Sequence, residues 1–221
     1  MKVSEVATQL VNLDDYVDQI IQDFKTSRLR KYYVELSAST VEDFDSLDAP
    51  APERPLDDVV KRVLLQKSRL ALLGNFGTGK TSFCKKFAHD LAVMYKSDAT
   101  VRIPVIVPLS DYETRLDIQE LITNTLQFRY GVRIDLTICQ ELQRLGRFLF
   151  LFDGFDEMAS RVDRDVVLDN LRELNKVARI KENKFVVTCR THFFRDNVEA
   201  SVFDEFETLY IPEWGATELG E

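Results

Sequence analysis

The stretch Gly74-Asn75-Phe76-Gly77-Thr78-Gly79-Lys80-Thr81, followed by Ser82, decides the fold of this 221-residue chain. It fits the phosphate-loop pattern G-x-x-x-x-G-K-S/T, with an apolar run before it and an apolar-periodic segment after it, as in a strand and a helix. Glycines let backbone N–H groups turn toward a phosphate, and the helix N-terminus adds partial positive charge. We therefore predict a nucleotide-phosphate site at residues 74–82. Lys80 should reach the β- and γ-phosphates, and the Thr81 hydroxyl should bind Mg²⁺.

The rest of the chain alternates short apolar runs with longer helical patterns, which is typical of a parallel sheet covered by helices. Candidate strands lie at 69–73, 103–109, 147–152, 184–189 and 208–211. Apolar residues at helical spacing predict helices at 13–34, 56–67, 81–95, 116–128, 137–145 and 165–180. The fold class is therefore α/β, with three layers and right-handed crossovers.

The first sixty residues carry most of the charge. The net charge is −8, and residues 1–60 hold thirteen acids against six bases, so residues 61–221 hold twenty-four against twenty-three. Seven acids and three prolines at 41–58 predict an exposed loop. We divide the chain into a helical extension with an acidic linker at 1–59, a nucleotide-binding domain at 60–212, and the start of a C-terminal lid region at 213–221.

A second cluster of candidate residues follows the apolar run at 148–152. Asp153 should hold Mg²⁺ through water, because oxygen ligands suit that cation. Asp156 and Glu157 are candidates to orient or deprotonate the attacking water. Arg190, directly after the run at 184–189, can pair with the oxygens of a third phosphate. The predicted catalytic set consists of Lys80, Asp156, Glu157 and Arg190.

Composition excludes several other classes of protein. With 45% hydrophobic and 30% charged residues the chain is globular, and the acidic balance argues against direct nucleic-acid binding. No apolar run approaches the ~20 residues that span a bilayer, and no signal pattern opens the chain, so we expect a cytoplasmic protein without membrane contact. Cys84, Cys139 and Cys189 lack metal-ligand spacing and are predicted to be buried free thiols.

Taken together, GNFGTGKTS, FLFLFDGFDEM and VVTCRT resemble the NACHT family of STAND signal-transduction NTPases, of bacterial type. The likeness covers about residues 60–212. Gly154 directly after Asp153 has the NACHT form, whereas ordinary AAA+ proteins place an acid there. The resemblance implies ATP or ADP with Mg²⁺ on a five-stranded sheet of order 5-1-4-3-2, and an adenine pocket near residues 33–36. Lys80, Thr81, Asp153 and Arg190 would have the roles given above.

The resemblance also implies a molecular switch. Members of the family hold ADP in a closed form and self-oligomerise through the NTPase domain in the ATP form. Bacterial members are often linked to phage defence or regulation. A complete member continues into a lid and a sensor region, which 221 residues do not accommodate, so we expect the chain to be a fragment.

Three functions remain open at this point. The first is an ATP-binding switch with slow hydrolysis. The second is a P-loop kinase or other phosphotransferase, although no acceptor motif is recognisable. The third is a nucleotide-binding scaffold without hydrolysis, because Gly154 stands where AAA+ proteins carry their catalytic acid. GTP is disfavoured, since neither 175–178 nor 183–186 completes the N-K-x-D guanine motif.

Overall fold

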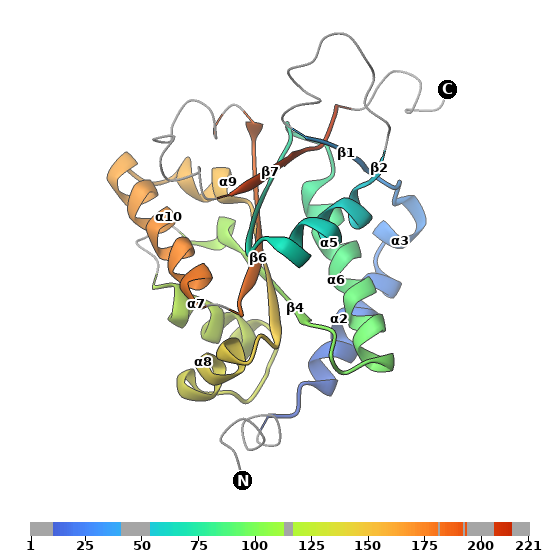
Figure 1. The fold of residues 1–221 in the computed structure, drawn as a ribbon, viewed down its shortest axis with the longest axis vertical. Helices are drawn as coiled ribbons and strands as arrows, with labels where there is room; N and C mark the ends of the chain where they lie inside the picture. The colour runs from blue at the N-terminus through green and yellow to red at the C-terminus, as the bar shows by residue number, and fades with distance from the viewer. Residues whose placement is uncertain are drawn as a thin grey trace.

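The computed structural model describes residues 11–40, 54–112, 117–180, 182–191, 193 and 206–213. A parallel sheet at its centre has the strand order β7-β3-β6-β5-β4, which is 5-1-4-3-2 along the chain (Figure 1). Its strands are β3 (Arg69–Leu73), β4 (Ile103–Pro108), β5 (Phe148–Asp153), β6 (Lys184–Cys189) and β7 (Glu207–Tyr210). The predicted order is confirmed, and Asp153 is the last residue of β5.

Two strands that the sequence did not predict extend this sheet. β1 (Ser37–Thr40) pairs antiparallel with β7, and β2 (Arg54–Pro55) pairs antiparallel with β1. The interpretation of 41–58 as a loop is therefore wrong at Arg54–Pro55, which form β2. From Leu56 the chain forms the helix that was predicted at 56–67. The polar sequence of β1 lacks an apolar alternation, so its pairing reflects the open edge of β7. Residues 41–53 lie outside the described part of the chain.

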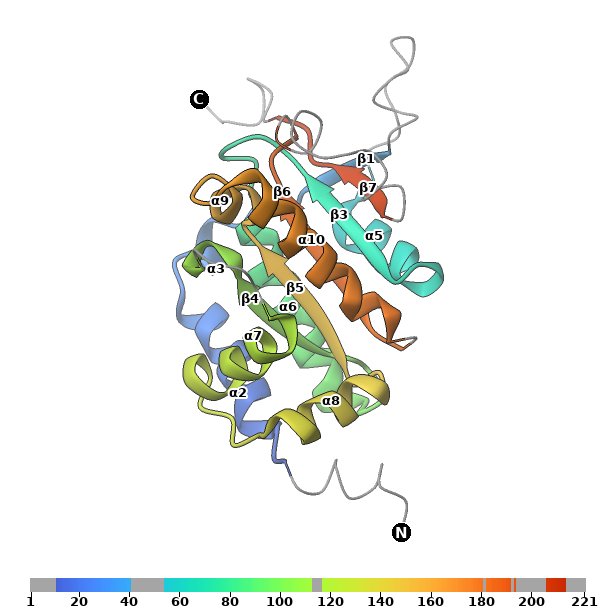
Figure 2. The ribbon, with the colours of Figure 1, turned by 90° about the vertical axis from the view of Figure 1, so that its left-hand side faces the viewer.

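Helices cover both faces of the sheet and complete the three layers. Figures 1 and 2 show α2, α5 and α6 on one face and α7, α8 and α10 on the other. Their bounds are α2 Asp14–Thr26, α3 Leu29–Tyr32, α5 Leu56–Gln66, α6 Lys80–Ser97, α7 Ile118–Asn124, α8 Leu136–Arg144, α9 Phe155–Ala159 and α10 Arg164–Arg179.

Two of the predicted helices are interrupted. The helix expected at 13–34 breaks after Thr26, where Ser27 takes an extended conformation and separates α2 from α3. The helix expected at 116–128 is the short α7 followed by a π-helical turn at Thr125–Arg129. No helix in the described residues is both long and apolar enough to cross a membrane.

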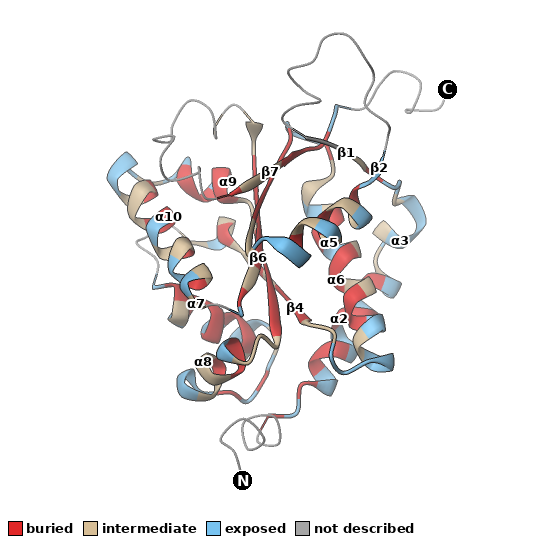
Figure 3. Ribbon diagram, viewed as in Figure 1, coloured by how far each residue is buried: buried red, intermediate tan, exposed pale blue. Residues whose placement is uncertain are grey.

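The core lies along the parallel strands, most of whose residues are buried (Figure 3). Phe150 stacks on Phe152, which in turn meets Phe185 of the neighbouring strand edge-on. Burial of strands on both sides explains why they appear in the sequence as continuous apolar runs. The three cysteines are buried and free, as predicted, and burial raises the pKa of each thiol.

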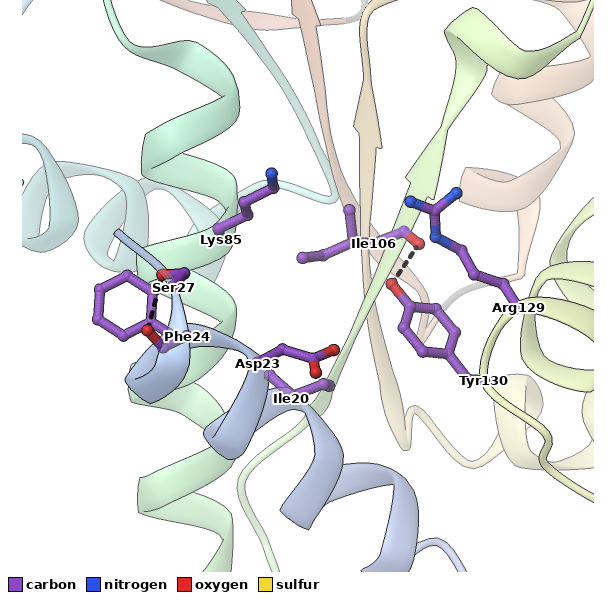
Figure 4. Close-up of a pocket in the computed structure, with 8 residues that line it drawn as sticks. All are labelled: Ile20, Asp23, Phe24, Ser27, Lys85, Ile106, Arg129 and Tyr130. Carbon is purple, nitrogen blue, oxygen red and sulfur yellow. Dashed lines mark hydrogen bonds between the residues drawn. The ribbon is translucent and has the colours of Figure 1, made fainter. Parts of the chain in front are cut away.

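The N-terminal helix α2 packs on α6 and reaches the open edge of β4 through Tyr16. The Tyr16 hydroxyl, on α2, donates to the carbonyl of Pro104 (2.7 Å), and the Tyr130 hydroxyl donates to that of Ile106 (3.3 Å). Both carbonyls face away from β5, so the two tyrosines cap the edge of the sheet. Figure 4 shows the adjoining cavity of about 260 Å³, with Lys85 on one side and Arg129 on the other.

The hydrophobic core is continuous from this helix to β7. The domain division at residues 59 and 60 stays a prediction. Of the segment 213–221, only Glu213 lies within the described residues.

Candidate nucleotide-binding site

The predicted phosphate loop joins β3 to α6 and is shaped by its glycines. Gly77 and Gly79 have φ of +81° and +93°, a left-handed conformation that favours glycine. The Thr78 hydroxyl donates to the Asn75 carbonyl at 2.9 Å and closes the loop. A Cβ on Gly74 would lie 2.6 Å from that hydroxyl, so this close turn also requires glycine. The loop brings the chain to the first turn of α6, whose N–H groups have no helical acceptor.

Lys80 lies across this loop. Its Nζ donates to the carbonyls of Gly74 (2.6 Å) and Asn75 (3.0 Å). Burial lowers the pKa of the ammonium group, and nearby carboxylates, Asp156 first, partly oppose that shift. A desolvated ammonium held at the loop can exchange carbonyl acceptors for phosphate oxygens.

Asp153 is positioned by a residue that the sequence analysis missed. Thr188, fully buried on β6, donates from its hydroxyl to Asp153 Oδ1 at 2.7 Å. The same hydroxyl accepts the backbone N–H of Gly154 at 2.9 Å. The available sequence signal was a hydroxyl in an otherwise apolar strand, one residue before its end. Thr188 therefore fixes one carboxylate oxygen of Asp153 and leaves the other for a metal ion.

Gly154 turns the chain from β5 into α9. Its φ of +82° is left-handed, while a Cβ placed there would meet no atom closer than 3.7 Å. The requirement for glycine is thus conformational rather than steric. This turn brings Asp156 and Glu157, in the first turn of α9, to the end of β5.

Asp156 and Arg190 form a two-point contact. Asp156 Oδ2 lies 2.8 Å from Arg190 Nε, and Oδ1 accepts the Arg190 backbone N–H at 3.1 Å. Asp156 is 7% exposed, so this pairing takes place largely out of water. Both oxygens of Asp156 are thus engaged with Arg190. Glu157, the next residue, is exposed and takes no part in the two contacts between Asp156 and Arg190.

Most of the predicted site residues surround one cavity of about 250 Å³ at the carboxyl ends of β3, β5 and β6. Its lining includes Phe76, Gly77, Gly79, Lys80, Thr81, Ser82, Asp153, Asp156, Glu157 and Arg190. Gly74, Asn75 and Thr78 lie at the base of the loop and do not line it. Ligands of open α/β sheets bind at this end of the strands.

The Thr81 hydroxyl and the Asp153 carboxylate also suit Mg²⁺. This cation takes one or two protein oxygens and completes its shell with water and phosphate. Leu36 adjoins the loop, because a Cβ on Gly79 would lie 3.3 Å from its Cδ1.

Comparison with known proteins agrees with this geometry. A family model of the NACHT domain matches residues 68–212. The chain belongs to the NACHT family. This NACHT chain is 30% identical, over 210 residues, to an uncharacterized WD repeat-containing protein of Nostoc sp., with 86% of the chain and 14% of that protein covered. The chain therefore spans about one seventh of the length of this relative.

Solved structures share the fold. The Orc1 protein of Aeropyrum pernix, solved in complex with DNA, has a TM-score of 0.53 and 21% identity, covering 74% of this NACHT chain and 45% of that chain. A Walker-type ATPase of Pyrococcus abyssi has a TM-score of 0.50 and 13% identity, covering 73% and 53%. At these identities the likeness concerns the fold alone. The chain has the nucleotide-binding domain of a P-loop NTPase.

Proposed function

We propose that this NACHT chain binds Mg-ATP and Mg-ADP, hydrolyses ATP slowly, and acts as a nucleotide-dependent switch. One observation carries the proposal: Lys80, Asp153 and Arg190, from three separate elements, line a single cavity. This cavity is lined by the phosphate loop with its Lys80 ammonium group, by the carboxylate of Asp153 as a possible metal ligand, and by the guanidinium group of Arg190. A third phosphate needs all of these for binding and reaction.

Each residue has a proposed role. Lys80 binds the β- and γ-phosphates, and Thr81 and Asp153 hold Mg²⁺, which when bound neutralises phosphate charge. Glu157 orients or deprotonates the attacking water. Asp156, predicted to share that task, instead holds Arg190, because both of its oxygens are engaged there.

The switch follows from differential contact. A ligand shifts a conformational equilibrium only by binding one state better than the other, and Arg190 offers a contact that ATP can make and ADP cannot. We propose that the ATP form self-associates through the NTPase domain, in a defence or regulatory system.

Other regions of the full protein also belong to this proposal. The Nostoc relative is named for WD repeats, and we assign trigger recognition to a repeat region of that kind, with a lid following the NACHT domain. We place the adenine near residues 33–36, because Leu36 adjoins Gly79. A cytoplasmic location and the lack of nucleic-acid binding stay predictions.

Phosphate release tests hydrolysis. Wild type should release phosphate slowly from Mg-ATP, and Glu157→Gln should abolish release while keeping nucleotide binding. Asp156→Asn should weaken binding of ATP more than binding of ADP, because it loosens Arg190. If all three proteins release phosphate at the same background rate, the chain is a non-hydrolysing scaffold. Size-exclusion chromatography with an ATP analogue and with ADP tests self-association.

A further inference from the structure

Phe76 is a large apolar residue that lies exposed on the surface, so its side chain is not stabilised by burial in the core. It is the third residue of the phosphate loop, and 84% of its surface is open to solvent. The guanidinium carbon of Arg190 lies over its ring, 5.5 Å from the ring centroid. At this distance a cation over an aromatic face is attracted by the ring quadrupole.

Arg190 is consequently held from two directions. Asp156 binds its Nε and its backbone N–H, which fixes one edge of the guanidinium group. The guanidinium group also lies over the ring of Phe76, which gives it a second point of contact. Among the described residues, neither Nη group has a hydrogen-bonding partner, and the Arg190 side chain is 36% exposed on the cavity wall. The two Nη groups are the donors that remain for a ligand.

The ring also joins two parts of the site. Phe76 belongs to the loop after β3, and Arg190 follows β6, whose Cys189 is paired with Leu73 of β3. In the proposed function, the loop surrounds the phosphates that ATP and ADP share, and Arg190 contacts the third phosphate. A contact between them makes the orientation of the arginine depend on the conformation of the loop.

We propose that Phe76 is a positioning residue for Arg190 and thereby sets the preference of the site for ATP over ADP. The inference rests on the proposed function, in which Arg190 contacts the third phosphate. Without the aromatic face the guanidinium group samples more orientations, so contact with the third phosphate weakens. The contacts that ADP makes with the loop backbone and Lys80 are unchanged.

Two substitutions separate positioning from simple damage to the loop. Phe76→Leu removes the aromatic face and keeps an apolar side chain, whereas Phe76→Tyr keeps the face. Because the side chain is 84% exposed, neither change disturbs the core. Dissociation constants of the β,γ-imido analogue of ATP and of ADP, both with Mg²⁺, would be measured for the 221-residue chain by calorimetry.

Phe76→Leu should lower the preference for the ATP analogue about two- to fivefold, which is the range of an exposed cation–π contact. Binding of ADP should stay within twofold of wild type, and Phe76→Tyr should behave as wild type. In an Arg190→Ala background, Phe76→Leu should have no further effect, since the two residues act through one contact.

Three results would overturn the inference: equal preference in the Leu and Tyr variants, equal weakening of both nucleotides, or an undiminished effect without Arg190. The proposed function fails separately. It fails if wild type binds neither nucleotide, or binds both equally well.

Discussion

Thr188→Val removes the contact that positions the metal-binding carboxylate. Valine has nearly the same shape, so the packing of this fully buried site is kept. Two hydrogen bonds are lost: one to the carboxylate of Asp153 at 2.7 Å and one from the Gly154 N–H at 2.9 Å. A bond to a charged group contributes about 1.5–3 kcal/mol, and an orphaned donor costs about 1–3 kcal/mol.

Asp153 and Gly154 are half-buried, so water can replace part of the hydrogen bonding that the substitution removes. We therefore expect the free energy of unfolding to fall by about 2–3 kcal/mol. Loss of a residue that orients a metal ligand typically lowers metal affinity about 10- to 100-fold. The Mg²⁺ concentration that supports half-maximal nucleotide binding should rise by that factor.

Urea unfolding and Mg²⁺ titrations of nucleotide binding would measure the two effects. Thr188→Ser keeps the hydroxyl and should retain wild-type Mg²⁺ dependence. Thr125→Val is the matched control: Thr125 is 3% exposed, and its hydroxyl donates to the Leu121 carbonyl within its own helical segment. The reasoning is refuted if Thr188→Val matches Thr125→Val in stability and wild type in Mg²⁺ dependence.

Three further predictions concern a left-handed glycine, a buried hydroxyl and a buried ammonium group. Gly154→Ala should cost about 1–2 kcal/mol of unfolding free energy through its φ of +82°. Gly131→Ala, at +67° in open space, should cost as much while leaving nucleotide binding intact; unequal losses in urea unfolding would count against a purely conformational cause. Tyr16→Phe should cost about 1 kcal/mol in the same assay, because it leaves a β4 carbonyl unpaired, and an unchanged stability would argue against edge capping. Burial lowers the pKa of Lys80, and only its protonated form attracts phosphate oxygens. As the pH is raised, nucleotide affinity should therefore begin to fall below pH 10.5, the usual lysine pKa. A dissociation constant that stays constant up to pH 10.5 would contradict this.

The five parallel strands were predictable because strands buried on both faces appear in the sequence as continuous apolar runs. Their order in the sheet was predicted from the family resemblance alone. The phosphate loop was predictable because its chemistry lies within eight consecutive residues. β1 and the break in the helix after Thr26 could not be predicted. They depend on the edge of a neighbouring strand and on tertiary packing, and the local sequence pattern does not determine them.

The contacts between pairs of site residues could not be predicted from the sequence either. Asp156 and Arg190 are separated by 34 positions, and each alone is an ordinary charged residue after a strand. Because of this pairing, we propose that Asp156 orients the arginine instead of activating water. Thr188 escaped notice for a similar reason, since its partner Asp153 lies 35 positions away on the neighbouring strand.

Binding of Mg-ATP by Lys80→Ala, compared with Lys85→Ala, tests the central claim most directly. Both lysines lie on α6, but Lys80 faces the phosphate loop and the exposed Lys85 lines the cavity beside β4. Charged hydrogen bonds predict about a 10- to 150-fold loss of affinity for Lys80→Ala, and Lys85→Ala should stay within twofold of wild type. Equal affinity of Lys80→Ala and wild type would contradict the assignment of this cavity as the nucleotide site.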